Sequence, residues 1–587
     1  MVSAMRNAEI AQALDELGDL YELDGVVVYR VVAYRQAAKA VRESAVAVEQ
    51  LAAQGRLTEL KGVGKTIEEK IEALLETGEI PAAAKLKGKF PPTLVQLTRL
   101  PGLGAKTARK LYDELGIASI EDLREAAEQG KLRSIAGLGP KLERNILAAL
   151  AAPHGVAGEG SNGGRWLLSQ VLPLAERIVE ELRSNPAADA VEIAGSARRM
   201  TDTCKDLDIV ATAHDPRALV DALVALDVTS EVKSDGDAGG RIVTHNGLVV
   251  ELRVVAPAQF GNLLQHLTGS KQHNVALREY AVRRGLHVSE YGIEDQDGET
   301  LTCANEPEVY ERLGLEYVQP ELREGRGEIE AALEHRLPRL VQEHELKGDL
   351  HSHTVASDGR NTMQEMAATA RKRGYSYLAI TDHSASFGFG HDVQPDELMR
   401  QVERIRELNA RTRGFKLLAG SEVSINPDGS LDYDDDLLAE LDWVNASVHS
   451  SFRLSEKKMT DRILAAMDNP FVDSIGHLTG RLIMRRDPYP LELERIVEHA
   501  AATRTMLEIN ANPDRRDLSD LHARLAAEAG VMVVINSDAH GTDTLELIRF
   551  GVATARRGWL TAEQVANTRP LRELRKLQKR VGSRAAG

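Results

Sequence analysis

The sequence contains little cysteine and few aromatic residues. Its 587 residues include two cysteines, Cys204 and Cys303, and aromatic side chains make up 4% of the chain. Two cysteines cannot form the disulfide framework of a small secreted protein, so they suit a reducing cytoplasm. No apolar run is long enough to span a membrane, and the N-terminal sequence MVSAMRNAEIAQ lacks the apolar core of a signal peptide. We therefore expect a cytoplasmic protein without a membrane partner.

Length, hydrophobic content and charge leave several function classes open. A chain of 587 residues with 43% hydrophobic residues predicts about three to five domains with ordinary cores. The formal net charge of −16 argues against a protein that coats nucleic acid non-specifically. Phosphate binding needs only a local positive surface, however, and carboxylates that bind divalent metals also lower the total charge. Charge alone therefore excludes neither nucleic acid nor metal.

One pattern occurs three times in the N-terminal third. Residues 57–71, 97–111 and 132–146 each contain an apolar lead, Gly-x-Gly, a basic residue and an apolar helix. The glycines allow a tight turn, and the next helix start offers unpaired N–H groups to an anion. A single such turn usually only connects two helices. Three in one register predict a phosphate-backbone site at Gly62, Gly64, Lys65, Gly102, Gly104, Lys106, Gly137, Gly139 and Lys141.

These repeats resemble helix-hairpin-helix motifs, which bind the DNA backbone without reading base sequence. Together with the basic helical stretch 29–44, the first repeat resembles the lyase domain of DNA polymerase beta-like enzymes. The resemblance gives Lys70 the role of an amine that forms a Schiff base with an abasic-site sugar, which requires a lowered pKa. Because Glu68 and Glu69 flank Lys70, an ordinary surface lysine stays an equal alternative.

Two acids lie on one predicted strand in the middle of the chain. Asp206 and Asp208 are two residues apart in DLDIVAT, so both side chains point to one face. Two carboxylates at one point repel each other unless a divalent cation lies between them. The preceding segment supplies N–H groups, a hydroxyl and guanidinium groups that suit phosphates, at Gly195, Ser196, Arg198 and Arg199.

A third acid interrupts the apolar stretch VVELRVV at 249–255. Alternation places Glu251 on the face opposite to Val250, Leu252 and Val254. A lone glutamate in a strand is ordinarily a solvent-facing residue. It becomes a metal ligand only if the neighbouring strand carries the two aspartates.

The GS-x-RR element and the three acids resemble the nucleotidyltransferase palm of family X DNA polymerases. The resemblance implies triphosphate binding by Gly195, Ser196 and Arg199. It also implies that Mg²⁺ or Mn²⁺ ions bind Asp206, Asp208 and Glu251. The family has aspartate where this chain has Glu251, and a misplacement of about 1 Å at a catalytic centre costs on the order of a hundredfold in rate. Polymerase activity is expected, and whether it is full or weak stays open.

Residues 266–285 resemble the nucleotide pocket of the same family. The resemblance implies that the nascent pair is contacted by a turn of Thr268, Gly269 and Ser270, and the nucleotide by Asn274. His266 and Leu267 replace a Tyr-Phe pair, which leaves the exclusion of ribonucleotides open.

The C-terminal part repeats an apolar strand that ends in a histidine or an acid. The set is His351, His353, Asp358, His383, Glu422, His449, His477, Asp538 and His540. Helical stretches lie between the strands, which predicts a barrel with its active site at the C-terminal strand ends. A lone histidine on a strand is more often a packing residue, but six histidines at equivalent positions, together with three acids, are hard to attribute to packing. Imidazole and carboxylate ligands favour Mn²⁺, Zn²⁺ or Fe²⁺ over Mg²⁺ alone, and clustered divalent ions hydrolyse phosphate esters.

This part resembles the polymerase-and-histidinol-phosphatase (PHP) domain, and all nine positions of that family's three-metal site are filled. The resemblance implies a distorted TIM-like (β/α)7 barrel, up to three Mn²⁺ or Zn²⁺ ions, and 3′-to-5′ exonuclease and 3′-end processing. The whole chain resembles bacterial family X DNA polymerases. The implied domains are a lyase-like helical domain at 1–85, fingers-like hairpins at 86–155, an α+β palm at 156–260, a thumb-like segment at 261–325, a linker at 326–345 and the PHP domain at 346–587.

We therefore expect a repair polymerase that fills short gaps in gapped or nicked DNA with dNTPs and trims 3′ ends, with a monomer as the default state. Three alternatives stay open. The first is a Mn²⁺-dependent nuclease whose palm only positions DNA, which Glu251 and the His266-Leu267 pair favour. The second is a small-molecule phosphatase, which leaves the hairpins and palm without a substrate. The third is a DNA-binding scaffold without catalysis.

Overall fold

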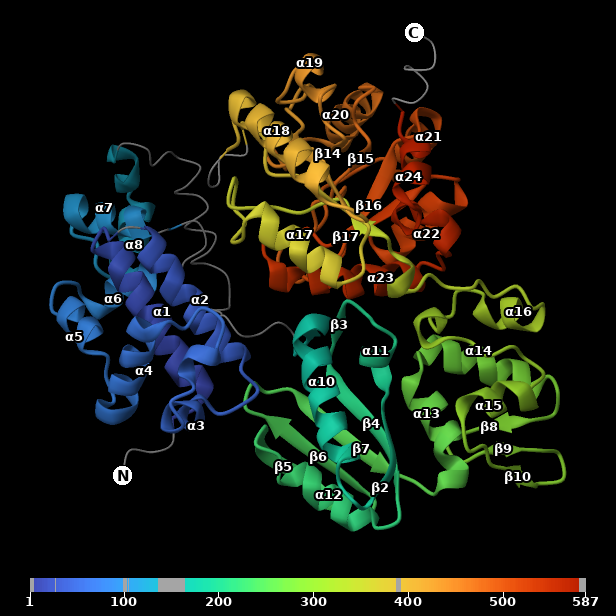
Figure 1. Cartoon of the computed structure of the whole chain (residues 1–587). Helices are drawn as coiled ribbons and strands as arrows, with labels where there is room; N and C mark the ends of the chain where they lie inside the picture. The colour runs from blue at the N-terminus through green and yellow to red at the C-terminus, as the bar shows by residue number, and fades with distance from the viewer. Residues whose placement is uncertain are drawn as a thin grey trace, which may run out of the picture. The chain divides into compact units, whose positions relative to one another are not determined.

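The computed structural model describes residues 5–26, 28–98, 103, 105–135, 164–386 and 392–579 (Figure 1). The chain forms two compact units. One comprises the described parts of 1–166 with 173–191 and 205–255, and the other comprises 167–172, 192–204 and the described parts of 256–587. Across the ranges that are described, no helix has the length and apolarity needed to cross a membrane.

The N-terminal part is helical, as predicted. Its helices are α1 (Asn7–Leu23), α2 (Val28–Glu43), α3 (Val48–Ala53), α4 (Lys65–Thr77), α5 (Pro81–Lys87), α6 (Pro92–Thr98), α7 (Ala105–Leu115) and α8 (Ile120–Glu128). Apolar residues of α1 recur at helical spacing, and Ile10, Leu14 and Leu17 are fully buried. In the first Gly-x-Gly turn, Gly62 has a φ of 90° and Gly64 caps the start of α4, so the turn needs a residue without a Cβ.

The second and third Gly-x-Gly turns are described only in part. Gly102, Gly104, Gly137, Gly139 and Lys141 lie outside the described residues, as does the side chain of Lys106. Helices α6 and α7 flank the second turn, which agrees with the predicted hairpin.

A five-stranded mixed sheet forms the middle of the chain, with strand order β2-β4-β7-β6-β5. The strands are β2 (Ala188–Ile193), β4 (Asp206–Ala213), β5 (Thr229–Gly236), β6 (Gly239–Thr244) and β7 (Val249–Val254), and the helices are α10 (Leu168–Arg183), α11 (Gly195–Arg198) and α12 (Pro216–Val224). Strand β7 alternates as predicted. Val250, Leu252 and Val254 are buried, while Glu251 is half-buried on the other face.

The next segment combines four helices with a small antiparallel sheet. Its elements are α13 (Phe260–Thr268), α14 (Lys271–Val282), β8 (His287–Val288), β9 (Ile293–Glu294), β10 (Thr300–Leu301), α15 (Glu306–Arg312) and α16 (Glu328–Leu333). A buried polar network supports it, since His273 contacts Glu328 at 2.8 Å and Tyr310 at 2.9 Å. Burial opposes ionisation of Glu306, but Arg323 and Arg198 outweigh it and hold the pKa of Glu306 at about 2. The carboxylate therefore stays charged and ties these segments together.

The C-terminal part is a parallel barrel of seven strands in sequential order. The strands are β11 (Gly348–Asp349), β12 (Tyr377–Ile380), β13 (Lys416–Ser424), β14 (Trp443–Ser447), β15 (Ser474–Ile475), β16 (Met506–Asn510) and β17 (Val533–Asn536). A bridge between Ser352 and Ala539 brings the first and last strands together. The predicted (β/α)7 barrel is thereby confirmed.

Helices cover the strands of this barrel on the outside (Figure 1). They are α17 (Met363–Lys372), α18 (Pro395–Arg411), α19 (Asp435–Leu438), α20 (Glu456–Asp468), α21 (Leu493–Thr503), α22 (Asp520–Glu528), α23 (Ile548–Arg557) and α24 (Leu571–Leu577). Strand residues such as Leu378, Ile380 and Val444 pack in one apolar core with helix residues such as Met366 and Ile463. Parallel strands covered by helices must be apolar on both faces, which explains the near-continuous apolar runs.

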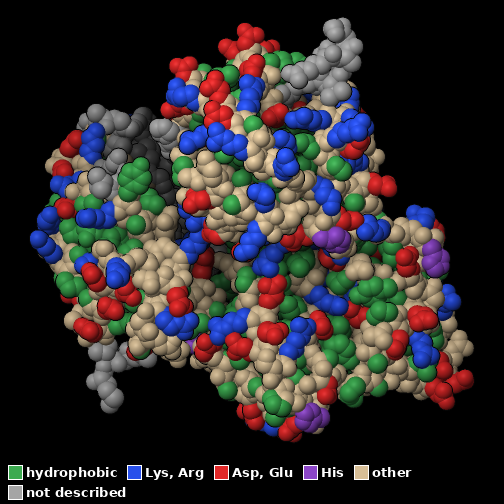
Figure 2. Space-filling model, viewed as in Figure 1, with side chains coloured by type: hydrophobic (Ala, Val, Ile, Leu, Met, Phe, Trp, Pro, Cys, Tyr) green, Lys and Arg blue, Asp and Glu red, His purple; other side chains and the backbone are tan. Residues whose placement is uncertain are grey.

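Charges of both signs are mixed over the visible face of the molecule (Figure 2). No large patch of one sign is visible in this view.

Candidate active sites and their metal ligands

The nine predicted ligands of the barrel converge at the C-terminal ends of its strands. His351 and His353 follow β11, His383 follows β12, and Glu422 lies in β13. His449 and His477 follow β14 and β15, and Asp538 and His540 follow β17. Asp358 reaches the group from the loop after β11. Because all seven strands are parallel, their C-terminal ends meet at one rim. The sequence places each ligand at a strand end, and closure of the barrel brings the ligands together.

Three groups of ligand atoms are compact enough to hold a metal ion among the residues described. Within each group the ligand atoms lie within 4.8 Å of one another. The groups are His353, Asp358, His383 and His540; His351, His353 and Asp538; and His383, Glu422 and His449. His477 joins the third group through its Nε2, which lies 2.9 Å from Oε1 of Glu422.

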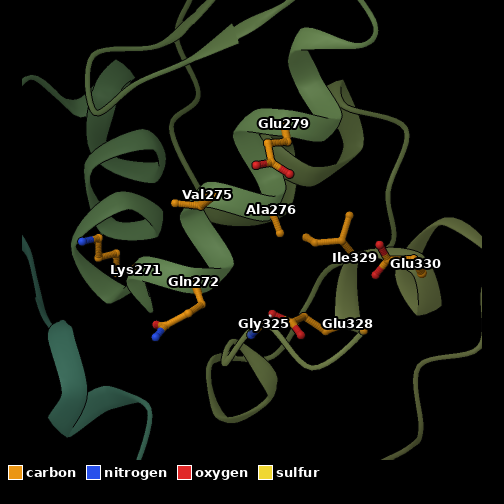
Figure 3. A pocket seen from close by; sticks show the side chains of 10 residues that line it. Lys271, Gln272, Val275, Ala276, Glu279, Gly325, Glu328, Ile329 and Glu330 are labelled. Atoms are coloured by element: carbon orange, nitrogen blue, oxygen red, sulfur yellow. Dashed lines mark hydrogen bonds between the residues drawn. The ribbon is translucent and has the colours of Figure 1, made fainter.

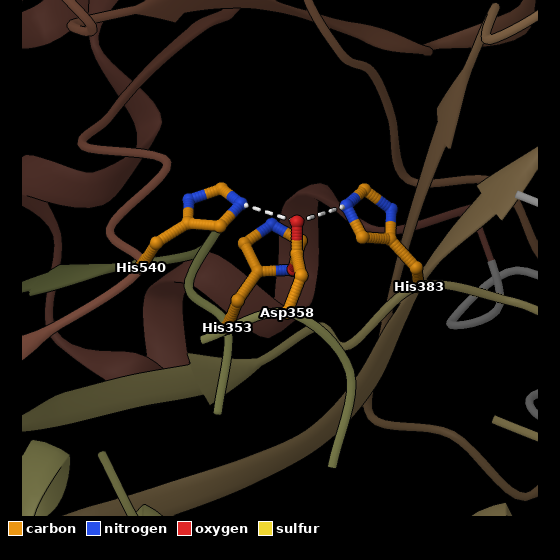
Figure 4. A group of neighbouring side chains, drawn as sticks. All are labelled: His353, Asp358, His383 and His540. Atoms are coloured by element: carbon orange, nitrogen blue, oxygen red, sulfur yellow. Dashed lines mark hydrogen bonds and ion pairs between the residues drawn. The ribbon is translucent and has the colours of Figure 1, made fainter. Parts of the chain in front are cut away.

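Figure 4 shows the first group, in which the carboxylate of Asp358 lies between His540 and His383. Its Oδ2 is 3.1 Å from Nε2 of His540 and 3.6 Å from Nε2 of His383. The rings of His353 and His540 stack with their centroids 4.2 Å apart. Four ligands from three separate loops therefore meet at one point, as a divalent cation requires.

The fit to a metal is tested by the buried nitrogen atoms. Nε2 of His351 and Nδ1 of His353 are buried and make no hydrogen bond. Nε2 of His351 lies 3.4 Å from a carboxylate oxygen of Glu422 and 3.4 Å from one of Asp538. Nδ1 of His353 lies 3.7 Å from a carboxylate oxygen of Asp358. Buried polar atoms are ordinarily paired, so nitrogens that face carboxylates without bonding to them suit a cation between the two.

The pKa values of several barrel ligands are shifted because imidazoles and carboxylates lie close together in a buried site. Burial, together with the charges of His540 and His383, lowers the pKa of His353 to about 4. Burial opposes protonation of His383 and His540 too, but nearby carboxylates outweigh it and raise their pKa values to about 10 and about 9. The neighbouring histidines hold the pKa values of Glu422 and Asp538 well below the usual range. Burial opposes protonation of His351 as well, but Glu508, Asp538 and Glu422 outweigh it and raise the pKa of His351 well above its usual value. Histidinium ions thus balance buried carboxylates here, a task that a metal ion would take over.

Glu508 is a strand residue that was not predicted from the sequence and that forms hydrogen bonds with two of the predicted ligands. Glu508 lies on β16, the one barrel strand without a predicted ligand, and is fully buried. Its Oε1 lies 2.7 Å from Nδ1 of His351, and its Oε2 accepts the backbone N–H of His477 at 2.8 Å. An N–H at Nδ1 that donates to this carboxylate leaves Nε2 of His351 as the metal-binding atom. The signal was present, because MLEIN places one acid in an apolar strand as VVELRVV does.

The palm acids lie side by side on two parallel strands. In the register of β4 and β7, Asp208 is opposite Glu251, and Asp206 is opposite Val249. Leu207 and Ile209 are fully buried on the other face of β4. All three carboxylates therefore face one side of the sheet, as the alternation predicted. In the described chain every compact metal-type group lies in the barrel, so the ligand atoms of these three acids do not all lie within 4.8 Å of one another.

The predicted nucleotide-binding loop and pocket turn are joined by two arginines. Arg198 donates to Oγ1 of Thr268 at 2.8 Å and pairs with Glu306, while Arg199 donates to the carbonyl of Thr268 and pairs with Glu324 at 3.1 Å. Gly195 and Gly269 both have a φ of 63°. The structure thus brings Gly195, Ser196 and Arg199 to the turn Thr268–Ser270.

Other predicted residues have local partners. Asn274 donates to the carbonyl of His266 at 2.8 Å and accepts from Gln265 at 2.9 Å. Ser270 caps α14 by accepting the N–H of His273. Lys70 lies half-buried on α4, the helix after the first hairpin, where the lyase resemblance expects it.

A hollow in the segment after the palm does not suit a triphosphate. It has a volume of about 520 Å³ and lies between α14 and the start of α16 (Figure 3). Its charged lining consists of Glu279, Glu328 and Glu330 against Lys271. Three carboxylates and one ammonium group repel phosphate, so we assign no nucleotide to this hollow.

Comparison with known proteins covers almost the whole chain. It is 39% identical over 580 residues to a protein of Bacillus subtilis named "DNA polymerase/3′-5′ exonuclease PolX", with 98% of this chain and 100% of that protein covered. The chain belongs to the bacterial family X DNA polymerases that carry a PHP domain.

Domain families match in the order that this assignment requires. Two helix-hairpin-helix models match residues 5–80 and 94–152, the DNA polymerase beta thumb model matches 263–324, and the PHP domain model matches 349–512. A probable phosphatase of Thermoanaerobacter sp. (strain X514) is 30% identical over 232 residues, which cover 38% of this chain and 89% of that protein. A probable phosphatase of Syntrophotalea carbinolica is 29% identical over 229 residues, covering 37% of this chain and 90% of that protein.

We predict that Mn²⁺ affinity rises with pH. His383 and His540, with pKa values of about 10 and about 9, must lose protons before they can bind a metal. Below pH 9, the apparent Mn²⁺ affinity should increase by at most about tenfold per unit rise in pH for each proton that the metal displaces. Calorimetric titration with Mn²⁺ in buffers of different ionisation enthalpy will count the released protons.

His499→Gln is the matched control, because His499 is a surface residue paired with Asp468 and should leave the proton count unchanged. An affinity that is the same at pH 6.5 and 8.5, without proton release, would contradict this assignment of charge.

We also predict that Glu508→Gln weakens metal binding. The amide keeps the size of the carboxylate but loses the charge that orients His351, so Mn²⁺ affinity should fall by about 10- to 100-fold. Nuclease activity should return at higher Mn²⁺ concentration. Glu498→Gln, on the exposed face of α21, is the control. An unchanged Mn²⁺ dependence in Glu508→Gln would show that this carboxylate only fills space.

Proposed function

We propose that the chain is a repair polymerase that fills short gaps in DNA and trims 3′ ends with its PHP domain. One observation supports this most directly. The similarity to a polymerase and 3′-5′ exonuclease extends over 98% of the chain, and an acid or a histidine stands at each ligand position that the resemblance implies, with Glu251 in place of an aspartate. DNA and dNTPs are the substrates that this family membership and its helix-hairpin-helix segments imply.

In the palm, Asp206, Asp208 and Glu251 would hold Mg²⁺ or Mn²⁺. Their carboxylates share one face of β4 and β7, and all three residues are half-buried. Gly195, Ser196 and Arg199 would bind the triphosphate, and Thr268, Gly269, Ser270 and Asn274 would line the nucleotide pocket. Arg199 would have to exchange part of its contact with Glu324 for phosphate.

In the barrel, the nine ligands would hold up to three Mn²⁺ or Zn²⁺ ions. Bound there, divalent ions supply a water of lowered pKa and positive charge for the leaving oxygen of a phosphodiester. Glu508 fixes the orientation of His351, and Asp382 fixes the loop of Asp358 by accepting from Thr354 and Ser357. The mixed imidazole and carboxylate set favours Mn²⁺ or Zn²⁺ over Mg²⁺.

The remaining predicted roles belong to the N-terminal helices. The three Gly-x-Gly turns would bind the DNA backbone, and Lys70 would act as the lyase amine. The domain limits 1–85, 86–155, 156–260, 261–325, 326–345 and 346–587 and a monomeric state complete the proposal.

The polymerase activity is tested with a one-nucleotide-gapped duplex, dNTPs and Mn²⁺ or Mg²⁺. The double variant His351→Ala, His353→Ala removes the trimming that would hide slow synthesis, and we expect it to fill the gap. Asp208→Ala should trim without filling. Glu251→Asp, made in the same nuclease-free background, should fill faster, by up to on the order of a hundredfold if the extra methylene misplaces the carboxylate.

No filling by the double variant, while the wild type shortens the primer under Mn²⁺, would mean that the palm only positions DNA. The conservative replacement Glu251→Asp then decides the cause, because restored filling assigns the loss to this side chain.

A further inference from the structure

Three loops at the C-terminal ends of β14, β15 and β16 pack against one another beside the metal ligands. They comprise residues 450–455, 478–492 and 511–519. The second and third are joined by the N–H of Ile483, which donates to the carbonyl of Asp514 at 2.7 Å. His449 and His477 directly precede the first two loops, and the three strands are neighbours in the barrel. The outer surface of these loops therefore borders the ligand cluster.

An aromatic residue and an arginine from different loops stack on this surface. The ring of Phe452 lies nearly parallel to that of Tyr489, with centroids 6.2 Å apart and an interplanar angle of 19°. The guanidinium carbon of Arg486 lies 4.4 Å from the centroid of Phe452. Arg486 also donates through Nε to the carbonyl of Gly480 at 2.9 Å, and the N–H of Gly480 donates to the carbonyl of His477 at 2.9 Å. The guanidinium group is thus fixed one turn from a metal ligand.

Several positive charges here have no direct ion-pair partner among the described residues, and the buried carboxylate of Asp517 attracts Arg486 and Arg515 only from a distance. In the part of the chain that the structure describes, no carboxylate forms an ion pair with Arg453, Arg486 or Arg515, whereas Arg485 pairs with Asp514 at 3.1 Å. Burial, and the neighbouring charge of Arg515, lower the pKa of Arg486. Like charges held close together are costly, and an anion between them removes that cost.

Each loop also contains one non-glycine residue in the left-handed region. The φ angles are 57° at Ser451, 64° at Met484 and 45° at Arg516. Such conformations cost free energy and persist where the surrounding structure imposes them, often at ligand-binding loops.

We define the arginine rim as Phe452, Arg453, Arg486 and Arg515. We propose that the arginine rim binds the phosphates and a base of single-stranded DNA just upstream of the 3′-terminal phosphodiester that the metal cluster cleaves. This inference rests on the proposed exonuclease function and names how its substrate is held. Guanidinium groups bind phosphate oxygens in pairs, and bases of single strands stack on arginine and aromatic planes. A stacked arginine next to two unpaired arginines offers both contacts on one surface.

The test uses the full chain without dNTPs. Release of the 3′ nucleotide from oligo(dT) under Mn²⁺ gives kcat and KM at several salt concentrations. The hydrolysis of bis(p-nitrophenyl) phosphate reports the metal cluster alone. For Arg486→Ala, Arg515→Ala we expect KM for oligo(dT) to rise on the order of tenfold, with small-substrate hydrolysis unchanged. The slope of log KM against log salt should become shallower by roughly 0.7 for each phosphate that the variant no longer binds.

The matched control is Arg404→Ala, Arg411→Ala, which removes two exposed arginines from α18 and should change neither value. Arg486→Lys separates charge from stacking, because lysine keeps the positive charge but lacks the planar guanidinium group. We expect this variant to have the salt slope of the wild type and a KM for oligo(dT) between those of the wild type and the double alanine variant.

An oligo(dT) KM and salt slope equal to those of the wild type would overturn the proposal and leave the exonuclease function standing. If the wild type does not shorten DNA, the proposed function fails instead, and binding of fluorescent oligo(dT), measured by anisotropy, still decides on the rim. If small-substrate hydrolysis falls as well, Arg453→Ala, at an exposed position, decides in the same assay. An unchanged KM in that variant also overturns the proposal.

Discussion

The buried carboxylate of Glu422 is the charge around which the C-terminal site is organised. It is 1% exposed, and its oxygens lie 2.9 Å from His383 and His477 and 3.2 Å from His449. A carboxylate at this depth is stable only with opposite charge around it, so the imidazoles of several strands must point inward. The parallel barrel makes this arrangement possible, because its strands end at one rim. A metal ion and a proton would be alternative counterions for the same buried charge, which is the reason for the predicted dependence of metal binding on pH.

A second layer of polar residues keeps the ligands in place. Glu508 connects His351 to the backbone of His477 and accepts from Asn536 at 2.9 Å. Asp382 stabilises the loop that carries Asp358, because its carboxylate accepts hydrogen bonds from the backbone N–H of Thr354 and the hydroxyl of Ser357. Such hydrogen-bond partners fix the tautomers and orientations of the ligands, and both affect the affinity for a metal.

The palm uses a simpler constraint, the register of two parallel strands. Pairing of Asp208 with Glu251 sets the carboxylates on one face without any loop. Because strand neighbours lie about 4.8 Å apart, the length of the third side chain determines where its oxygens lie. If Glu251 is the third metal ligand, as proposed, its extra methylene group relative to aspartate therefore shifts the position of its oxygens. The nucleotide loop, by contrast, depends on arginines that bond to the pocket turn and to Glu306 and Glu324.

The sequence by itself determined much of the organisation. Its period-two alternation placed Glu251 opposite Val250 and Leu252, because local spacing fixes which face a side chain occupies. Its repeated strand-plus-ligand pattern predicted a barrel with candidate ligands at the strand ends, while the number of strands and the nine-ligand set came from the resemblance to the PHP family. Tertiary structure alone decided which residues from distant segments meet. The apolar surroundings of Glu508 were visible in the sequence, but its contacts with His351 and His477 were not. Phe452, Arg486 and Arg515 likewise come from three loops that meet because their strands are neighbours in the barrel. Spacing along the chain carries no information on such contacts, because their distances depend on how separate strands and loops pack.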